Sequence, residues 1–192
     1  MQAARGTSVE TPDSGESRPF LARRGTWLLF AAVAVVAYAA DQVAKRLAVT
    51  HLHARDDVQV VGDLLQLRLT HNPGAAFSLG TDFTVALAFL AMVASLVLLW
   101  FSRGLRDRVW AVGLGLILAG IDGNLTDRMI RDPGPFRGEV VDFLMLPHWP
   151  IFNVADMCIN VGALLVLVQI FRGIRLDGSR AVSSPSSDED DS

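Results

Sequence analysis

Four apolar segments separated by polar loops dominate the pattern of the chain. They run from Trp27 to Ala40, from Phe83 to Phe101, from Val109 to about Leu125 and from about Phe152 to Phe171, and the first continues with helical spacing to Val49. A helix needs roughly 20 residues to cross about 30 Å of hydrocarbon. Each segment reaches that length when its flanking polar residues are included. The pattern therefore predicts four transmembrane helices.

Arginines in the short loops set the expected orientation of these helices. They precede the first segment, lie between the second and third, and follow the fourth, so all of them fall on one side of the membrane. They are Arg23, Arg24, Arg103, Arg106, Arg108, Arg172 and Arg175. Because short cytoplasmic loops carry an excess of Lys and Arg, we expect both termini in the cytoplasm. The loops at about 50–82 and about 128–151 then face outward.

The period of the pattern changes within the first outward loop. Leucines alternate with polar residues over Leu65–Thr70, which is typical of a half-buried strand rather than a helix. We therefore expect an all-α membrane protein with four transmembrane helices and a small extracytoplasmic β-cradle.

The two ends of the chain have compositions typical of disorder. Residues 1–25 are rich in Ser, Gly, Thr, Pro and Arg without apolar periodicity, and the chain finishes on the acidic run Asp188–Asp191 followed by one serine. We expect a disordered cytoplasmic tail at 1–25, a transmembrane domain at 26–172, and a disordered acidic cytoplasmic tail at 173–192.

The first apolar segment has a second interpretation, as a cleaved signal peptide. Three arginines precede about ten apolar residues, and Ala37-Tyr38-Ala39 resembles a cleavage site. Against cleavage, the helical pattern continues through Asp41 and Lys45, which stand four apart on one face, where opposite charges pair. We expect the segment to remain in place as the first transmembrane helix.

Composition supports the membrane interpretation and excludes other classes. Hydrophobic residues make up 51% of the chain, and the net charge of −3 provides no basic surface for nucleic acid, which is therefore not an expected partner. The single cysteine, Cys158, forms no internal disulfide and lies in an apolar run, so we expect it to pack in the protein.

Polar side chains in the predicted helices gather toward the outer side of the membrane. An ionisable group in a spanning helix is costly and is a functional candidate by default. Between Thr84 and Trp100 the second helix carries only Ser95 and small or apolar residues, so we expect it to be a lipid-facing wall. The gathered residues are Asp41 and Lys45, then Asn124, Asp127 and Arg128, then Asn153 and Asp156, with Asp142 in the outer loop.

Small residues recur every four positions along the third helix and end at Asp127. They let two helices approach closely, so we expect this carboxylate to be delivered into the bundle. On the fourth helix Asn153, Asp156 and Asn160 share one face, so Asp156 is expected to face protein. The small residues are Ala111, Gly115, Ala119 and Gly123.

Structural interpretations of these polar residues are also open. Asp41 with Lys45 fits an orienting pair, and Asp127 with Arg128 fits an ion pair at a helix end. Asn153 fits an N-cap of the fourth helix, because Asn accepts the unpaired amide protons there.

Catalysis is the alternative interpretation for two of the carboxyl groups. From spacing alone, Asp142 and Asp156 are each a candidate for a catalytic role. The chain lacks the His-Glu-x-x-His motif of zinc peptidases. His51 with His53 is too sparse for a metal site, so no metal or other cofactor is expected. Spacing does not single out Asp142 among its neighbours.

Five short motifs follow one another along residues 26–172. They are Asp41-Gln42-x-x-Lys45, Asn72-Pro73-Gly74-Ala75-Ala76-Phe77, Gly120-x-x-Gly123-Asn124-x-x-Asp127-Arg128, Val140-Val141-Asp142-Phe143 and Phe152-Asn153-x-Ala155-Asp156. Through these motifs, in this order, the chain resembles the lipoprotein signal peptidase family, also called signal peptidase II. Each motif is weak by itself, and the ordered set on a four-helix frame is specific.

The resemblance implies a function and assigns residues to it. Members remove signal peptides from diacylglyceryl-modified prolipoproteins, cutting on the amino side of the lipidated cysteine, and are inhibited by globomycin. It implies that Asp142 and Asp156 are the catalytic pair of an aspartic endopeptidase in the bacterial cytoplasmic membrane, with its site at the extracytoplasmic face and membrane lipid as a further partner. The substrate-binding residues implied by the matching motifs are Asn72, Gly74, Asn124, Arg128 and Asn153, and Asp41, Lys45 and Asp127 remain structural.

Some features depart from the family pattern, and other functions remain open. Ala119 replaces the first of two glycines, both tails are additions, and the loop from Arg131 to Glu139 is longer than usual, which leaves the approach of Asp142 to Asp156 open. A small transporter or proton-conducting bundle would also carry intramembrane carboxylates, spread through the membrane depth. A structural membrane adaptor is the third alternative.

Overall fold

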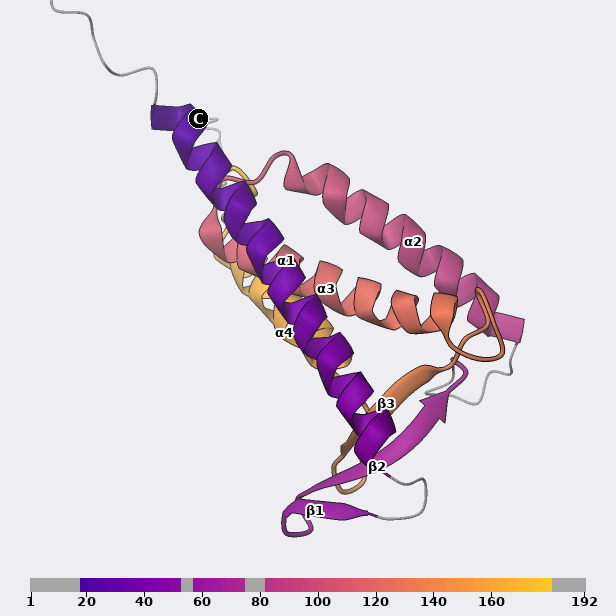
Figure 1. Ribbon diagram of the computed structural model, residues 1–192. Helices are drawn as coiled ribbons and strands as arrows, with labels where there is room; N and C mark the ends of the chain where they lie inside the picture. The colour runs from indigo at the N-terminus through magenta and orange to yellow at the C-terminus, as the bar shows by residue number, and fades with distance from the viewer. Residues whose placement is uncertain (1–17, 53–56, 75–81, 181–192) are drawn as a thin grey trace, which may run out of the picture.

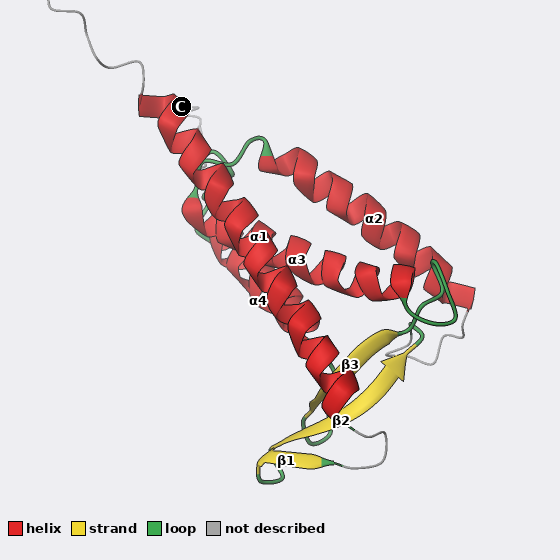
Figure 2. Ribbon diagram, in the orientation of Figure 1, coloured by secondary structure: helices red, strands yellow, loops and turns green. Residues whose placement is uncertain are grey.

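The computed structural model describes residues 18–52, 57–74 and 82–180, and within them the chain forms four helices and one three-stranded sheet (Figures 1 and 2). Each helix is long and apolar enough to cross a membrane, so the prediction of four spanning helices is confirmed. The helices are α1 (Arg18–His51), α2 (Asp82–Ser102), α3 (Arg108–Ile130) and α4 (Val154–Phe171), and the strands are β1 (Val58–Val61), β2 (Leu65–Asn72) and β3 (Val140–Met145).

Helix α3 is the centre of the bundle, since it packs against α1, α2 and α4 (Figure 1). Glycines make two of these approaches close. A Cβ atom added at Gly115 would lie 2.9 Å from the carbonyl oxygen of Phe30 in α1, and one added at Gly120 would lie 2.3 Å from that of Ala155 in α4. The predicted stripe of small residues therefore faces α1 and leads to the fully buried Asp127. A second small-residue face toward α4 was not predicted.

Helix α2 forms the outer wall of the bundle, as the sequence predicts. Long apolar side chains such as Leu90, Leu96 and Trp100 are exposed on it. Its mid-helix serine has a contact that the pattern does not show, because the buried Ser95 donates a hydrogen bond to Asp122 of α3 at 2.5 Å. A polar contact within the apolar layer thus ties the wall to the central helix.

The sheet lies at the end of the bundle where α1 and α3 end and α4 begins (Figure 2). Its order is β1-β2-β3 with antiparallel pairing, and β2 contains the stretch in which alternation predicts a strand. The third strand was not predicted. It places Asp142 opposite Thr70 in the register. Asp142 therefore stands on the strand that enters the bundle end.

The structure describes residues on both sides of the expected transmembrane domain at 26–172. Helix α1 begins at Arg18, so the helix includes part of the expected disordered region 1–25. At the other end, residues 173–180 form a closed turn in which Arg175 donates its N–H to Ser179 at 2.8 Å. The carbonyl of Leu176 also accepts the N–H of Arg106 at 2.9 Å, which docks the turn on the loop before α3. The expectation for 1–17 and 181–192 lies outside the described residues.

The contact between α3 and α4 gives a stability prediction. Gly120→Ala places a methyl group against the Ala155 backbone, which cannot move without shifting α4. We expect it to lower the free energy of unfolding by about 1–3 kcal/mol in a thermal unfolding assay in detergent. Gly25→Ala in α1 is the control, because a Cβ there meets nothing within 4 Å. Equal unfolding temperatures for the two variants would contradict the close packing.

Candidate active site

Asp142 and Asp156 come together from two elements at the bundle end. Asp142 lies on β3 and Asp156 in the first turn of α4, and both line one cavity of about 810 Å³. The longer loop between α3 and β3 does not keep them apart. It closes on the end of α3, where Gly138 donates its N–H to the Arg128 carbonyl at 3.1 Å.

Asn153 joins the two carboxyl groups. As the predicted N-cap of α4, its Oδ1 accepts the N–H of Asp156 at 3.0 Å, and its own N–H donates to Asp156 Oδ2 at 3.1 Å. Its remaining donor, Nδ2, reaches Asp142 Oδ1 at 2.6 Å. The capping interpretation is confirmed. The same residue also holds both acids in one arrangement, so its cap is part of the site.

Asp142 is almost completely buried, with 2% of its surface exposed. Burial raises the pKa of this carboxyl to about 6, the Asn72 hydrogen bond opposes that shift, and the nearby charge of Asp156 adds to it. The Asn72 donor, Nδ2, lies 2.9 Å from Asp142 Oδ2. Asn72 Oδ1 in turn accepts the N–H of Gly74, whose φ of 129° favours glycine. The next residues of this motif, 75–77, lie outside the described residues.

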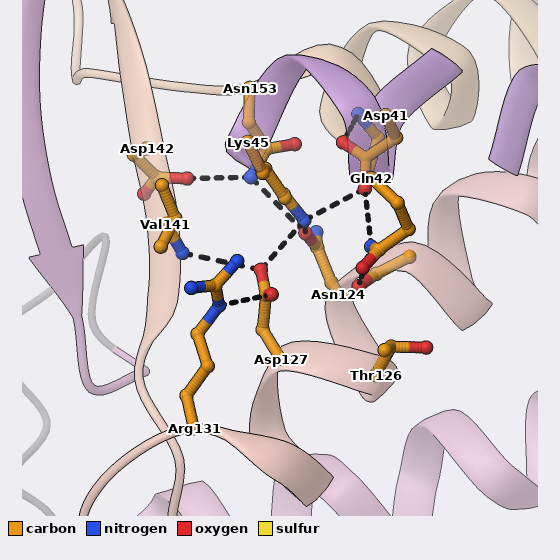
Figure 3. A network of polar contacts seen from close by, with 12 residues as sticks. Asp41, Gln42, Lys45, Asn124, Thr126, Asp127, Arg131, Val141, Asp142 and Asn153 are labelled. Atoms are coloured by element: carbon orange, nitrogen blue, oxygen red, sulfur yellow. Dashed lines mark hydrogen bonds and ion pairs between the residues drawn. The ribbon is translucent and has the colours of Figure 1, made fainter. Parts of the chain in front are cut away.

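An ion cluster with a fully buried centre lies next to Asp142 and Asn153 (Figure 3). Lys45 Nζ lies 3.0 Å from Asp41 Oδ2 and 2.8 Å from Asp127 Oδ2, and all three side chains have no exposed surface. Arg131 Nε completes the cluster at 2.5 Å from Asp127 Oδ1. Two cations thus balance two carboxylates. The orienting pair of Asp41 and Lys45 is confirmed.

The cluster connects the two elements that carry Asp142 and Asp156 to α1 and α3. Asp41 Oδ1 accepts the N–H of Ala155 at 2.8 Å, which ties α1 to the first turn of α4. Asp127 Oδ2 accepts the N–H of Val141 at 3.3 Å, which ties α3 to β3 beside Asp142. The charged cluster therefore holds the backbone of the residue that precedes each catalytic candidate.

The expected ion pair between Asp127 and Arg128 is wrong. Neighbouring residues of a helix do not face each other, so when Asp127 points at α1 its neighbour points away. Arg131, four residues on, stands on the correct face and was missed, although the i, i+4 spacing is the signal that could have found it. Gln42 was also missed, and it donates to Asp41 Oδ2 at 3.0 Å and to the Gly123 carbonyl at 3.2 Å.

Arg128 lies beside the two acids and is partly buried. Within the described part of the chain its Nε atom has no hydrogen-bond partner, and its Nη1 donates to the Asn124 carbonyl at 3.3 Å. Its charge is close enough to be attracted by Asp142, Asp127 and Asp156, although Arg128 and Asp127 form no direct ion pair. The guanidinium thus has donor capacity left beside the cavity.

Asn124 stands between the ion cluster and the catalytic candidates. Its Oδ1 accepts from Lys45 Nζ at 2.9 Å and from Asn153 Nδ2 at 3.1 Å, and its Nδ2 donates to Asp156 Oδ1 at 2.9 Å.

Among the residues described, no three His, Cys, Asp or Glu side chains form a group able to hold a metal ion. The arrangement is suited to proton transfer between carboxyl groups, water and a bound carbonyl.

Comparisons with known proteins agree on one family. The family model described as signal peptidase (SPase) II matches residues 33–172. The lipoprotein signal peptidase of Rhodococcus jostii (strain RHA1) is 42% identical over 167 residues, which cover 87% of this chain and 84% of that protein. That of Mycobacterium leprae (strain Br4923) is 41% identical over 172 residues, covering 90% of this chain and 85% of the relative.

Solved structures with the same fold are also found. A bacterial membrane enzyme solved by the in meso method at 2.3 Å resolution has a TM-score of 0.68 and 25% identity, covering 83% of this chain and 95% of that one. A second, at 1.9 Å resolution, has a TM-score of 0.67 and 27% identity, covering 77% and 94%.

The buried cluster predicts a large penalty for removing its central cation. Lys45→Met leaves two carboxylates without a partner at Nζ, and we expect a loss of about 3–5 kcal/mol in the free energy of unfolding. Replacing Asp41 by Asn in the same chain removes one of these charges and leaves Asp127 with Arg131, so the double variant is expected to recover most of the loss. Thermal unfolding in detergent measures both. A single variant as stable as the double would refute this account.

Proposed function

Because the chain belongs to the signal peptidase II family of membrane aspartic peptidases, which cleave signal peptides from prolipoproteins, we propose that Asp142 and Asp156 carry out this cleavage here. The observation that carries the proposal is the double contact of Asn153, which holds the two carboxyl groups at one cavity. The cut falls on the amino side of a cysteine that bears diacylglycerol. A globomycin-type cyclic peptide is the expected inhibitor.

The chemistry proposed for the pair is hydrolysis by one shared proton. One carboxylate takes a proton from water as the water attacks the scissile carbonyl, and the other carboxyl group protonates the carbonyl oxygen. Two carboxyl groups this close do not easily ionise together, so they retain one proton between them and titrate as a coupled unit. The raised pKa of Asp142, about 6, supports this state.

The position of the cavity supports a lipid-modified substrate. It lies at the N-terminal end of α4, where exposed apolar residues such as Met157 and Val161 follow Asp156 along the helix. Acyl chains on a cysteine remain in the lipid and hold the scissile bond near the surface. A site at helix ends therefore meets the bond without extracting the lipid. Asn72 and Gly74, Asn124 and Arg128, and Asn153 are the residues proposed to hold this substrate.

The chain is a multi-pass bacterial membrane protein, and we propose that its site faces away from the cytoplasm. The exposed arginines between α2 and α3 and after α4 lie at the bundle end opposite the sheet (Figure 1). Short cytoplasmic loops are rich in such residues, which supports cytoplasmic termini. The transporter alternative has no support, because the matching family model and the similar curated proteins are signal peptidases.

Isosteric replacement of either acid tests the proposal. We expect Asp142→Asn and Asp156→Asn each to reduce cleavage of a diacylglyceryl lipopeptide by at least about 10³-fold, because the shared proton or its acceptor is lost. Mass spectrometry of the products, with and without globomycin, measures it.

The matched control is Asp63→Asn, on the exposed turn between β1 and β2, which we expect to cleave at the unmodified rate. Normal processing by either of the first two variants, with the fold intact, would exclude the pairing.

The rate should also depend on pH through Asp142. Its raised pKa means that the shared proton is lost as pH rises through about 6, so kcat/KM is expected to fall above that value. Since the Asn72 hydrogen bond lowers this pKa, Asn72→Ala should move the alkaline limb of the profile to higher pH. A pH series of lipopeptide cleavage measures both. An alkaline limb that moves to lower pH in this variant would contradict the assignment.

A further inference from the structure

The buried ammonium of Lys45 makes three short contacts, one for each of its protons. Two go to the carboxylates of Asp41 and Asp127, at 3.0 and 2.8 Å, and the third goes to Asn124 Oδ1 at 2.9 Å. An ammonium has three donors and no acceptor, so its capacity is filled. Structural pairing accounts for the first two contacts. The third leads toward Asp156.

The contacts of Asn124 fix which side of its amide faces Asp156. Its oxygen takes protons from Lys45 and from Asn153, which fills both lone pairs. The amide nitrogen is then turned to Asp156 Oδ1, 2.9 Å away. The opposite orientation would set Nδ2 against two donors. Lys45 therefore determines that Asp156 receives a hydrogen-bond donor that is itself polarised by a positive charge.

The two acids are treated differently by this arrangement. Asp156 accepts the polarised amide of Asn124 and the N-cap N–H of Asn153, and lies at the N-terminus of α4, where negative charge is favoured. Asp142 lies on a strand, is almost fully buried and accepts from the side chains of Asn72 and Asn153. Within the described residues, Asp142 has no counterpart of Asn124. Neither amide that donates to Asp142 has its oxygen bound to Lys45.

We propose that Lys45 is a positioning residue that acts through Asn124 to keep Asp156 as the ionised acid, so that the shared proton stands on Asp142. This inference rests on the proposed function of the pair. The pKa of Asp142, raised to about 6 by burial, agrees with that location of the proton.

The inference assigns each step of the reaction to one acid. Asp156 takes a proton from water while the water oxygen bonds to the carbonyl carbon, and Asp142 gives its proton to the carbonyl oxygen. When the carbon–nitrogen bond breaks, Asp156 passes its proton to the leaving amine. Asp142 recovers a proton from one hydroxyl of the intermediate, which restores the starting state.

Other charged groups lie around the two acids, and the charge of Lys45 also acts directly on Asp142, so a test must separate this field from the relay. They are Asp41 and Lys45 on α1, Asp127, Arg128 and Arg131 at the end of α3, and Asp142 on β3. His71 lines the same cavity from β2. Loss of Lys45 by itself would change this field as well as the relay.

Two variants separate the relay from the field. Asp41→Asn with Lys45→Met removes one negative and one positive charge, so the net charge of the cluster stays constant while the contact to Asn124 is lost. Asn124→Leu keeps the Lys45 charge and removes the amide that connects it to Asp156. Asp41→Asn by itself is the control, because it keeps both Lys45 and Asn124.

The measurement is the pH profile of kcat/KM for cleavage of a diacylglyceryl lipopeptide by the full chain in detergent. If the relay operates, the acidic limb of this profile moves up by about one pH unit in both test variants, because the donor polarised by Lys45 is lost. The Asp41→Asn control should not move it up. An acidic limb that stays in place in both variants, with only a uniform loss of rate, would show Lys45 to be purely structural and overturn the inference.

Two further measurements keep the result interpretable. Thermal unfolding identifies a variant that has lost its fold, and Asn124→Leu remains informative if the double variant does so, since Lys45 keeps both carboxylate partners there. Cleavage by Asp142→Asn or Asp156→Asn would refute the proposed function itself. If Asp142→Asn and Asp156→Asn are inactive but the acidic limb stays in place in the two relay variants, only the role of Lys45 is refuted.

Discussion

The contact between the buried Lys45 ammonium and the carboxylates of Asp41 and Asp127 is the constraint on which the rest of the structure depends. Charges without exposed surface are tolerated only when they are paired and hydrogen-bonded. Each carboxylate in this cluster also accepts a backbone N–H from another element. Asp41 holds the backbone of Ala155, and Asp127 holds Arg131 and the backbone of Val141. The hydrogen bonds that make the buried charges tolerable are therefore the same ones that place α4 and β3.

Close helix packing and the ion cluster depend on each other. A Cβ atom added at Gly123 would lie 2.6 Å from Asp41 Oδ2, so the carboxylate occupies the space that a side chain would need. Glycine at this position lets α1 and α3 approach until Lys45 reaches Asp127. Packing by small residues is therefore what makes the electrostatic contacts short. The same approach brings Asn124 within reach of both Lys45 and Asp156.

Local patterns predicted most of the fold, and the tertiary contacts set the limit. Four helices and the β2 region follow from length, apolarity and alternation, which are properties of single segments. The strand β3 was not predicted, because its residues Val140–Phe143 are all buried and a short run buried on both faces shows no alternation of apolar and polar residues. The N-cap role of Asn153 could be predicted, since a cap depends only on residues next to one another in the sequence.

The chemistry of the site was predictable only in part. Spacing gathered Asp142 and Asp156 at one side of the membrane, and the family resemblance, not spacing, selected Asp142. The Asp127–Arg128 pair was mistaken because sequence adjacency does not mean a shared helix face. The position of Asn124 between Lys45 and Asp156 depends on three helices meeting, which no periodicity within one helix can specify.

The hydrogen bond from the Ala155 N–H to Asp41 spans 114 positions of the chain, from the first helix to the last. A chain that is still being synthesised has α1 and its carboxylate in the membrane long before α4 exists to receive them. Until α4 is inserted and capped, Asp156 has no fixed place beside Asp142. Asp156 therefore takes its place beside Asp142 only when α4, the last of the described helices, closes the bundle.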